Sequence, residues 1–311
     1  MSSANEVVGR RRPVPREVPG WVVWLLGLDQ PETNKRIVWI ILLGAAVTVA
    51  AARLTTVPLE DGKHFTVAGA WAITTAMVLI VLAALGMQRL YRVGGILIGD
   101  RNVMSLTRFQ VASWTVLIGS ALLTLGLCRA FSGGVGNQDA LNIIIPDPVW
   151  QLLGISGGST ILATMIKKNK QNMEPAGNQT ARTASMIEGE TPASVEANRQ
   201  GILYGNSDPK DARFMDMLEG DEVGNSAYLD IAKVQMFFFT VIALLLYGGV
   251  LWDMFYNKSA AAISSFPDLT PTLVTITGIS HAAYLGTKAV TQTTTDPNAT
   301  PKPADPPPAQ G

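Results

Sequence analysis

Polar side chains that could form a functional site occur at matching positions in two segments of this sequence. Gln110 lies two residues after a cation and five before Thr115, and Gln235 has the same spacing between a cation and Thr240. Each glutamine lies just inside an apolar run, where its amide can hydrogen-bond to a neighbouring helix at about 0.6–2 kcal/mol. The pattern has two interpretations, a structural clamp between repeated units or a polar ring at a pore mouth, and we favour the clamp.

A second motif, Gly-Ile-Ser, is also repeated. It runs from Gly154 to Ser156 in the first copy and from Gly278 to Ser280 in the second. Small residues of this kind let two helix backbones approach closely. His281 follows the second copy, where the first copy has a glycine. An ionisable side chain at membrane depth is a candidate for proton or ligand sensing, although a neutral histidine bonded to a carbonyl or a hydroxyl is the commoner outcome.

The remaining polar residues do not form a recognisable catalytic set. Asp216, Glu219, Asp221 and Glu222 form an acidic cluster without the ligand spacing of a calcium loop, so we interpret it as a solvated face that pairs with basic linkers. The sequence has two His and one Cys, and it contains no phosphate-binding glycine loop, dinucleotide fingerprint or zinc-binding His-Glu motif. We therefore predict a protein that is not an enzyme and has no catalytic residues, no metal and no cofactor.

The elements that position these residues are apolar helices. Hydrophobic residues make up 48% of the chain and charged residues 15%, whereas soluble domains have about 25% charged residues. Uncharged runs occupy 37–52, 66–88, 109–128 and 234–252. Crossing a hydrocarbon core of about 30 Å takes about 20 apolar residues in a helix, and these runs fit that length, the first with help from its flanks. They predict an integral membrane protein.

Two further segments, 150–166 and 270–287, lack charge but are rich in Gly, Ser and Thr. Such segments can span the membrane fully, re-enter it or form short buried helices. We predict full spans because small-residue helices pack backbone to backbone, where hydroxyls find partners. The expected fold is therefore all-α and polytopic, with about six transmembrane helices in three hairpins.

The sequences of the last two hairpins predict an internal repeat. SLTRFQVASWT (105–115) and IPDPVWQLLGISGGS (145–159) flank the first apolar run, and LDIAKVQMFFFT (229–240) and FPDLTPTLVTITGISHAAY (266–284) flank the second. Both hairpins start on the same side of the membrane. The two copies are thus predicted to be parallel, related by an axis near the membrane normal.

The chain divides into six predicted parts. They are a basic cytoplasmic arm with an interfacial segment (1–36), a first transmembrane hairpin (37–88), repeat 1 with its inside linker (89–167), a cytoplasmic loop (168–226), repeat 2 (227–290) and a Pro-rich tail (291–311). The loop is polar and poor in aromatics, so we predict it and the tail to be mostly disordered. Phe214, Met217 and Leu218 recur at i, i+3 and i+4 and predict a short amphipathic helix near 211–219.

The distribution of positive charge predicts the orientation. With six spans, 20 of the 24 lysines and arginines lie on the side of both termini, which is therefore expected to be cytoplasmic in a bacterial inner membrane. The net charge of zero provides no field that would attract nucleic acid. The expected partners are the lipid bilayer and either further copies of the chain or a protein bound at the cytoplasmic loop.

Several of these motifs resemble paired motifs of uncharacterised bacterial multi-pass membrane proteins. The resemblance is carried by SLTRFQ (105–110) with WT (114–115), by LLGIS (152–156), and by GDEVGN (220–225) before VQM (234–236). It covers roughly residues 100 to 290. No activity is known for such proteins, so the resemblance implies only a bacterial inner-membrane setting.

Two functions stay open on the sequence. The first is a membrane anchor, scaffold or assembly subunit that acts through its duplicated hairpins and cytoplasmic loop. The second is a homo-oligomeric channel or transport-related pore lined by the Gln, Ser and Thr positions of the repeats. A conducting path usually needs charged rings or polar stripes within its spans. Because the intramembrane polar groups here are few and neutral, we favour the scaffold.

Overall fold

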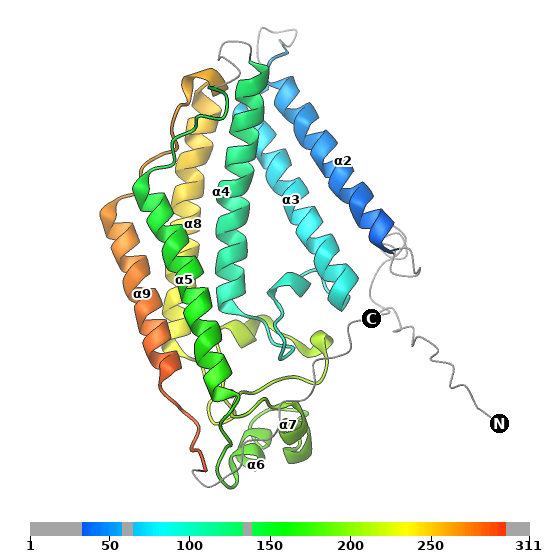
Figure 1. Ribbon diagram of the computed structural model, residues 1–311, viewed down its shortest axis with the longest axis vertical. Helices are drawn as coiled ribbons and strands as arrows, with labels where there is room; N and C mark the ends of the chain where they lie inside the picture. The colour runs from blue at the N-terminus through cyan, green and yellow to red at the C-terminus, as the bar shows by residue number, and fades with distance from the viewer. Residues whose placement is uncertain (1–32, 58–64, 133–138, 297–311) are drawn as a thin grey trace, which may run out of the picture.

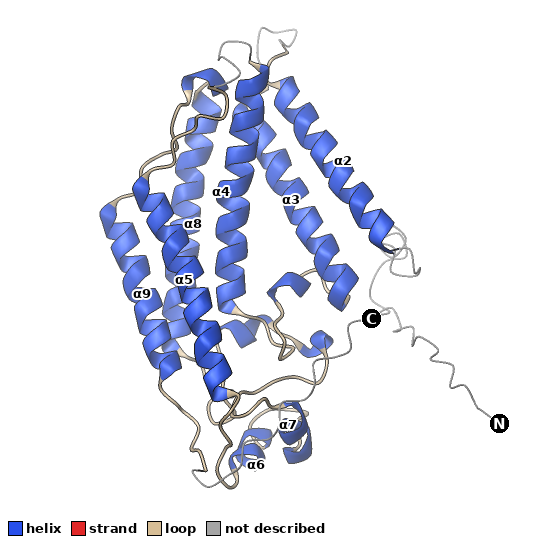
Figure 2. Ribbon diagram, in the orientation of Figure 1, coloured by secondary structure: helices blue, strands red, loops and turns tan. Residues whose placement is uncertain are grey.

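A computed structural model describes residues 33–57, 65–132 and 139–296, with side chains from residue 37 onward. The predicted interfacial segment and most of the predicted tail lie outside these ranges. Within them the regular structure is helical, accompanied only by isolated bridges (Figure 2). The long helices are α2 (Thr33–Leu54), α3 (Val67–Leu90), α4 (Leu106–Phe131), α5 (Asp147–Lys170), α8 (Ile231–Asn257) and α9 (Pro271–Ala289). The short ones are η1 (Gly95–Leu97), α6 (Gln179–Ala184), α7 (Pro192–Asn198), η2 (Pro209–Asp211), η3 (Phe214–Met217) and η4 (Ala260–Ala262).

Among the described residues, the helices α2, α3, α4, α5 and α8 are long and apolar enough to cross a membrane. The all-helical class and the multi-pass architecture predicted from the sequence are therefore confirmed at this level. Large apolar side chains also cover much of the outer surface of the bundle, Trp39 and Leu245 each being 70% exposed. A soluble protein rarely exposes so much apolar surface, whereas a bilayer solvates it.

The helix ends follow from local sequence. Asp230 precedes α8, and its carboxylate accepts the backbone N–H of Ala232 and Lys233. The hydroxyl of Thr66 accepts the N–H of Gly69 at the start of α3. The helices α5 and α9 each begin with a proline at the first or second position, where a missing N–H costs no helical hydrogen bond.

Four helices form a closed ring. The helix α4 packs against α5 and α8, and α9 packs against the same two helices. The α2–α3 hairpin lies on the flank, where α3 contacts α4 and α8 (Figure 1). The core at one end of the ring contains Trp114, Leu125, Tyr247, Phe255 and Phe266. The two predicted repeat hairpins, α4–α5 and α8–α9, thus share one interior.

The α4–α5 and α8–α9 connections, at the end of the ring away from α6 and α7, are tied to each other. Ile144 donates its N–H to Ser264 and accepts the N–H of Phe266, which pairs the two chain segments in parallel. Arg129 is buried and donates to the carbonyls of Asp139 and Ile263. This end of the ring is therefore held by backbone pairing and one buried guanidinium.

At the other end, residues 171–230 form a folded layer, which we call the polar layer (Figure 1). This corrects the prediction that 168–226 is mostly disordered. The layer has a small core of its own, in which Val195, Tyr204 and Val223 are buried with Val103 from the turn before α4. The polar composition of this segment predicted disorder wrongly, because a few buried apolar residues suffice to fold the layer when its polar groups pair with the helix ends.

The amphipathic helix expected near 211–219 is also corrected. The structure has two short 3-10 turns, η2 and η3, in place of an α-helix. Met217 is buried as the spacing predicted, but Phe214 is half exposed and contacts the ring of Phe237 edge-on at 5.6 Å. The carboxylate of Asp216 accepts the N–H of Arg213 and fixes η3.

Candidate functional site

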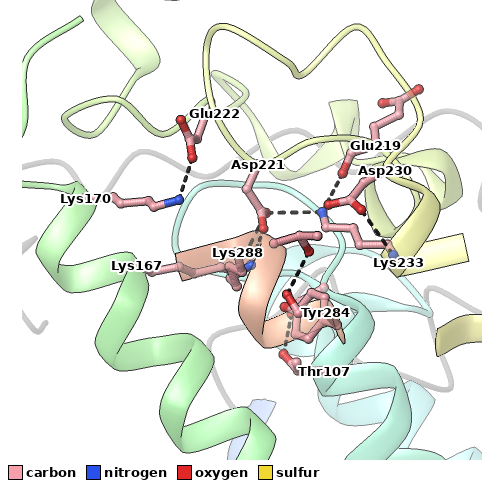
Figure 3. A network of polar contacts seen from close by, with 12 residues as sticks. Thr107, Lys167, Lys170, Glu219, Asp221, Glu222, Asp230, Lys233, Tyr284 and Lys288 are labelled. Carbon is pink, nitrogen blue, oxygen red and sulfur yellow. Dashed lines mark hydrogen bonds and ion pairs between the residues drawn. The ribbon is translucent and has the colours of Figure 1, made fainter. Parts of the chain in front are cut away.

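The partly buried carboxylate of Asp221 joins the polar layer to the helices (Figure 3). The guanidinium of Arg101 lies 2.8 Å from it, the ammonium of Lys233 at 3.4 Å and that of Lys167 at 3.9 Å. Lys288 makes a further ion pair with the same carboxylate. These four cations come from the turn before α4, the end of α5, the start of α8 and the end of α9. We call the five residues the Asp221 hub.

A second carboxylate, which is fully buried, lies beside the hub. Glu222 is 2% exposed, and its Oε1 atom lies 2.5 Å from Nζ of Lys170 in the last turn of α5. Its Oε2 atom accepts the backbone N–H of Gln292 at 2.9 Å and that of Thr293 at 2.7 Å. Glu222 therefore fixes the chain after α9 to the end of α5.

The surrounding cations lower the pKa of Asp221. Burial by itself would raise the pKa of Asp221, but the attraction of Lys233, Lys288, Lys167 and Arg101 outweighs burial and holds this pKa well below its usual range. Buried ammonium groups need several partners to offset their lost hydration. Lys233 accordingly also donates to the carbonyl of Glu219, and Lys170 donates to that of Val290.

The helix ends explain why cations collect at this place. Lys167, Lys170 and Lys288 lie in the last turns of α5 and α9, where the helix dipole favours positive charge. Lys233 lies in the first turn of α8, where the dipole opposes it. The hub carboxylate of Asp221, which lies within ion-pair distance, offsets that unfavourable position.

The chemistry of this arrangement is charge pairing. A cavity of about 290 Å³ adjoins the hub. Its lining includes positively charged side chains, such as Lys167 and Lys288, and the negatively charged side chains of Asp221 and Glu222. Among the described residues no group of three or more His, Cys, Asp or Glu is placed to hold a metal ion. The four cations of the hub pair with its one carboxylate, and Glu222 pairs with Lys170 beside it, which suits a structural joint between layer and bundle.

A second cluster brings together three of the residues singled out in the sequence. Gln110 on α4 is fully buried, and its Nε2 donates to Oγ1 of Thr240 on α8 at 2.6 Å. The same nitrogen lies 3.3 Å from Nε2 of His281 on α9. Thr240 in turn donates to the carbonyl of Met236. A glutamine of the first hairpin thus joins both helices of the second.

The other predicted site residues do not join this cluster. Thr115, Gly154 and Gln235 are exposed on the surface of the bundle. Ser156 and Ser280 are buried on α5 and α9, and the Ser280 hydroxyl donates to a carbonyl of its own helix.

The Gly-Ile-Ser segments of α5 and α9 lie beside each other. A Cβ added to Gly278 would lie 3.6 Å from the tip of Ile155, so α9 approaches the first motif closely at this glycine. A Cβ on Gly154, Gly157 or Gly158 would meet nothing within 4 Å, so the glycines of the first copy do not make this contact.

The Asp221 hub was not predicted as a site. The acidic cluster was expected to be solvated and to pair with basic linkers, and only the pairing agrees with the structure, because Glu222 is buried. A usable signal was present in the sequence. Lys167, Lys233 and Lys288 each stand at the end of an apolar segment, and Asp221 and Glu222 lie in the loop that joins those segments.

Comparisons of the chain with protein-family models, with curated proteins and with solved structures find no match. The function is therefore inferred from the geometry of the two clusters.

Proposed function

We propose that this protein is a non-enzymatic multi-pass scaffold of a bacterial inner membrane, in which a rigid polar layer offers a platform to a partner on the cytoplasmic side. The observation that carries the proposal is the Asp221 hub. One carboxylate binds cations from four separate segments, Arg101, Lys167, Lys233 and Lys288. A layer fixed in this way keeps its shape and position, and preorganisation of a binding surface lowers the cost of recruiting a partner.

In this proposal α9 is the sixth span, and the α4–α5 and α8–α9 hairpins are a parallel repeat. The 19 residues of α9 reach about 28 Å, close to the thickness of the hydrocarbon core. Two contacts support the repeat. Ile144 pairs in parallel with the segment around Ser265, and Ile155 contacts Gly278. In each case the two segments occupy corresponding positions of the hairpins.

The polar layer is assigned to the cytoplasm by its charge. The layer and the helix ends beside it carry Arg92, Arg101, Lys167, Lys168 and Lys170, among others, whereas Arg53, Arg129 and Lys258 lie at the opposite end. Positive charge in short loops is retained on the cytoplasmic side during insertion. In this proposal, with six spans, the N-terminus and the C-terminus are both cytoplasmic.

A photo-crosslinking experiment in native membranes tests the scaffold. A photoreactive amino acid at Met186 or Lys210, which are exposed on the layer, is expected to give adducts with one defined soluble protein or with a second copy of the chain. Leu141, exposed at the opposite end, is the control position and should not give that adduct. Adducts with lipid alone at Met186 and Lys210 would contradict the proposal.

The channel is a second candidate because the Gln110 cluster contains unpartnered atoms. Oε1 of Gln110 and Nδ1 of His281 are buried without a hydrogen-bond partner, and water or a permeating ion could use them. The scaffold proposal expects purified protein in planar bilayers to be electrically silent. Reproducible unitary currents that change with Gln110→Ala, but not with the exposed Gln235→Ala, would favour the channel.

A further inference from the structure

A second cavity, of about 370 Å³, lies between the start of α4 and the end of α5. We call it the basic pocket. Its lining includes four cationic side chains, Arg101, Arg108, Lys167 and Lys168, and a single carboxylate, that of Asp100. A cavity with this excess of positive charge attracts an anion. It is distinct from the cavity beside the hub, where both signs are present.

Several cations of the basic pocket lack a close anionic partner. Lys168 is exposed and makes no ion pair within the described ranges, and Arg108 makes one long hydrogen bond, 3.4 Å, to the carbonyl of Ile96. Lys167 is 3.9 Å from Asp221, the longest of the hub contacts. Only Arg101 is fully engaged, with its guanidinium held by Asp221 and the carbonyl of Tyr204. Arg108 and Lys168 therefore remain able to bind an anion, whereas Lys167 is shared with the Asp221 hub.

The start of α4 adds to this potential. Ser105, the residue before the helix, makes no side-chain cap, and the first turn contains no acidic residue. The free N–H groups of a helix start favour an anion. The hydroxyls of Ser105 and Thr107, which hydrogen-bond to each other at 3.0 Å, also line the pocket beside this helix start.

The neighbouring surface indicates which anion the pocket would take. Both α4 and α5 are apolar enough to cross a membrane, and the pocket lies where α4 begins and α5 ends. On the same turns of α5 as Thr164, Ile161 is 63% and Met165 is 60% exposed. A free phosphate ion would make no contact with this apolar surface, whereas the acyl chains of a lipid would cover it.

We propose that the basic pocket binds the phosphate of an anionic phospholipid headgroup, with the acyl chains lying along α5. Basic pockets between transmembrane helices at the cytoplasmic face bind such headgroups in other membrane proteins. The phosphate would be held by Arg108 and Lys168, with the start of α4 as an additional donor. The site does not depend on the recruitment of a partner by the polar layer.

Delipidated full-length protein in a neutral detergent tests the site. The thermal unfolding midpoint is measured during titration with phosphatidylglycerol, with phosphatidylcholine and with inorganic phosphate. We expect saturable stabilisation by phosphatidylglycerol only. Arg108→Gln and Lys168→Gln should each weaken the apparent affinity about fivefold, and the double variant about 25-fold. Lys210→Gln, which removes an equal charge from an exposed position away from the pocket, should leave the affinity unchanged.

The outcomes are separable. Because Arg108 and Lys168 are exposed, the variants are expected to keep the unfolding midpoint of the unaltered protein in the absence of lipid. Equal phosphatidylglycerol affinity in the double variant and the unaltered protein would overturn the proposal. Stabilisation by inorganic phosphate at the same affinity would show a soluble ligand and would overturn the lipid assignment, and equal stabilisation by phosphatidylcholine would show that the charge is not recognised.

Discussion

The guanidinium of Arg101 lies 2.8 Å from the carboxylate of Asp221, although 120 positions separate the two residues in the chain. Arg101 also donates to the carbonyl of Tyr204 at 2.6 Å, so one buried side chain joins the turn before α4 to the polar layer. The same carboxylate binds lysines of α5, α8 and α9. Asp221 is therefore the residue at which cations from the most segments meet, and Glu222 adds a second tie between the layer and α5.

Replacing Asp221 should therefore destabilise the protein strongly. Asp221→Asn leaves buried cations without their shared counter-charge, and breaking a buried pair in this way costs about 3–5 kcal/mol. The free energy of unfolding in detergent measures the loss. Asp211→Asn, which removes an exposed carboxylate of the same layer, is the matched control and should change stability by less than about 0.5 kcal/mol. Equal effects of the two variants would contradict the role of the hub.

The pH dependence of stability should carry the signature of Asp221. Its pKa is held well below the usual range by the cations, so its contribution is present above the unfolded-state pKa of about 3.9 and is lost as pH falls through the folded-state pKa. Burial raises the pKa of Asp216 and of Glu219, so these groups act oppositely and stabilise the fold as pH falls through their raised values.

The unfolding midpoint measured from pH 7 downward is thus expected to hold or rise slightly to about pH 4 and to fall below it. In Asp221→Asn the fall below about pH 4 should be smaller, because the group that loses its charge is gone. If the unfolding midpoint of this variant falls below about pH 4 as steeply as that of the unaltered protein, other carboxylates cause the loss of stability.

The two repeat glutamines should respond differently to the same substitution. Gln110→Leu removes a buried amide that bonds Thr240 and contacts His281, and we expect a loss of about 0.6–2 kcal/mol in the free energy of unfolding. Gln235→Leu alters an exposed side chain and should be close to neutral. Comparison of the two variants in one detergent checks this directly, and equal costs would show that the repeats are used alike.

A close approach of backbones between α3 and η1 gives a further prediction. A Cβ on Gly86 would lie 2.7 Å from the carbonyl oxygen of Arg92 and 2.8 Å from the nitrogen of Gly95. Gly86→Ala should therefore cost about 1–3 kcal/mol through forced backbone shifts. Gly119→Ala in α4, where a Cβ meets nothing within 4 Å, is the control and should be neutral or slightly stabilising. Thermal unfolding of the two purified variants makes the comparison.

The sequence by itself determined the long helices and their apolar character. Uncharged runs such as 109–128 and 234–252 fall within α4 and α8, because length and the absence of charge are sufficient to define a helix that a bilayer can solvate. The start of α8 is fixed locally as well, because the carboxylate of Asp230 accepts the N–H of Ala232 and Lys233.

The tertiary structure alone decided which of two equivalent residues is buried and which loop is folded. Gln110 and Gln235 have the same local sequence spacing, yet only Gln110 is enclosed, because burial depends on which helices pack around a residue. The local sequence likewise predicts that Asp221 is a solvated acid. In the structure, four segments distant in sequence bring their cations to it. Pairing over such separations leaves little trace in local pattern, since it is set by the packing of the whole bundle.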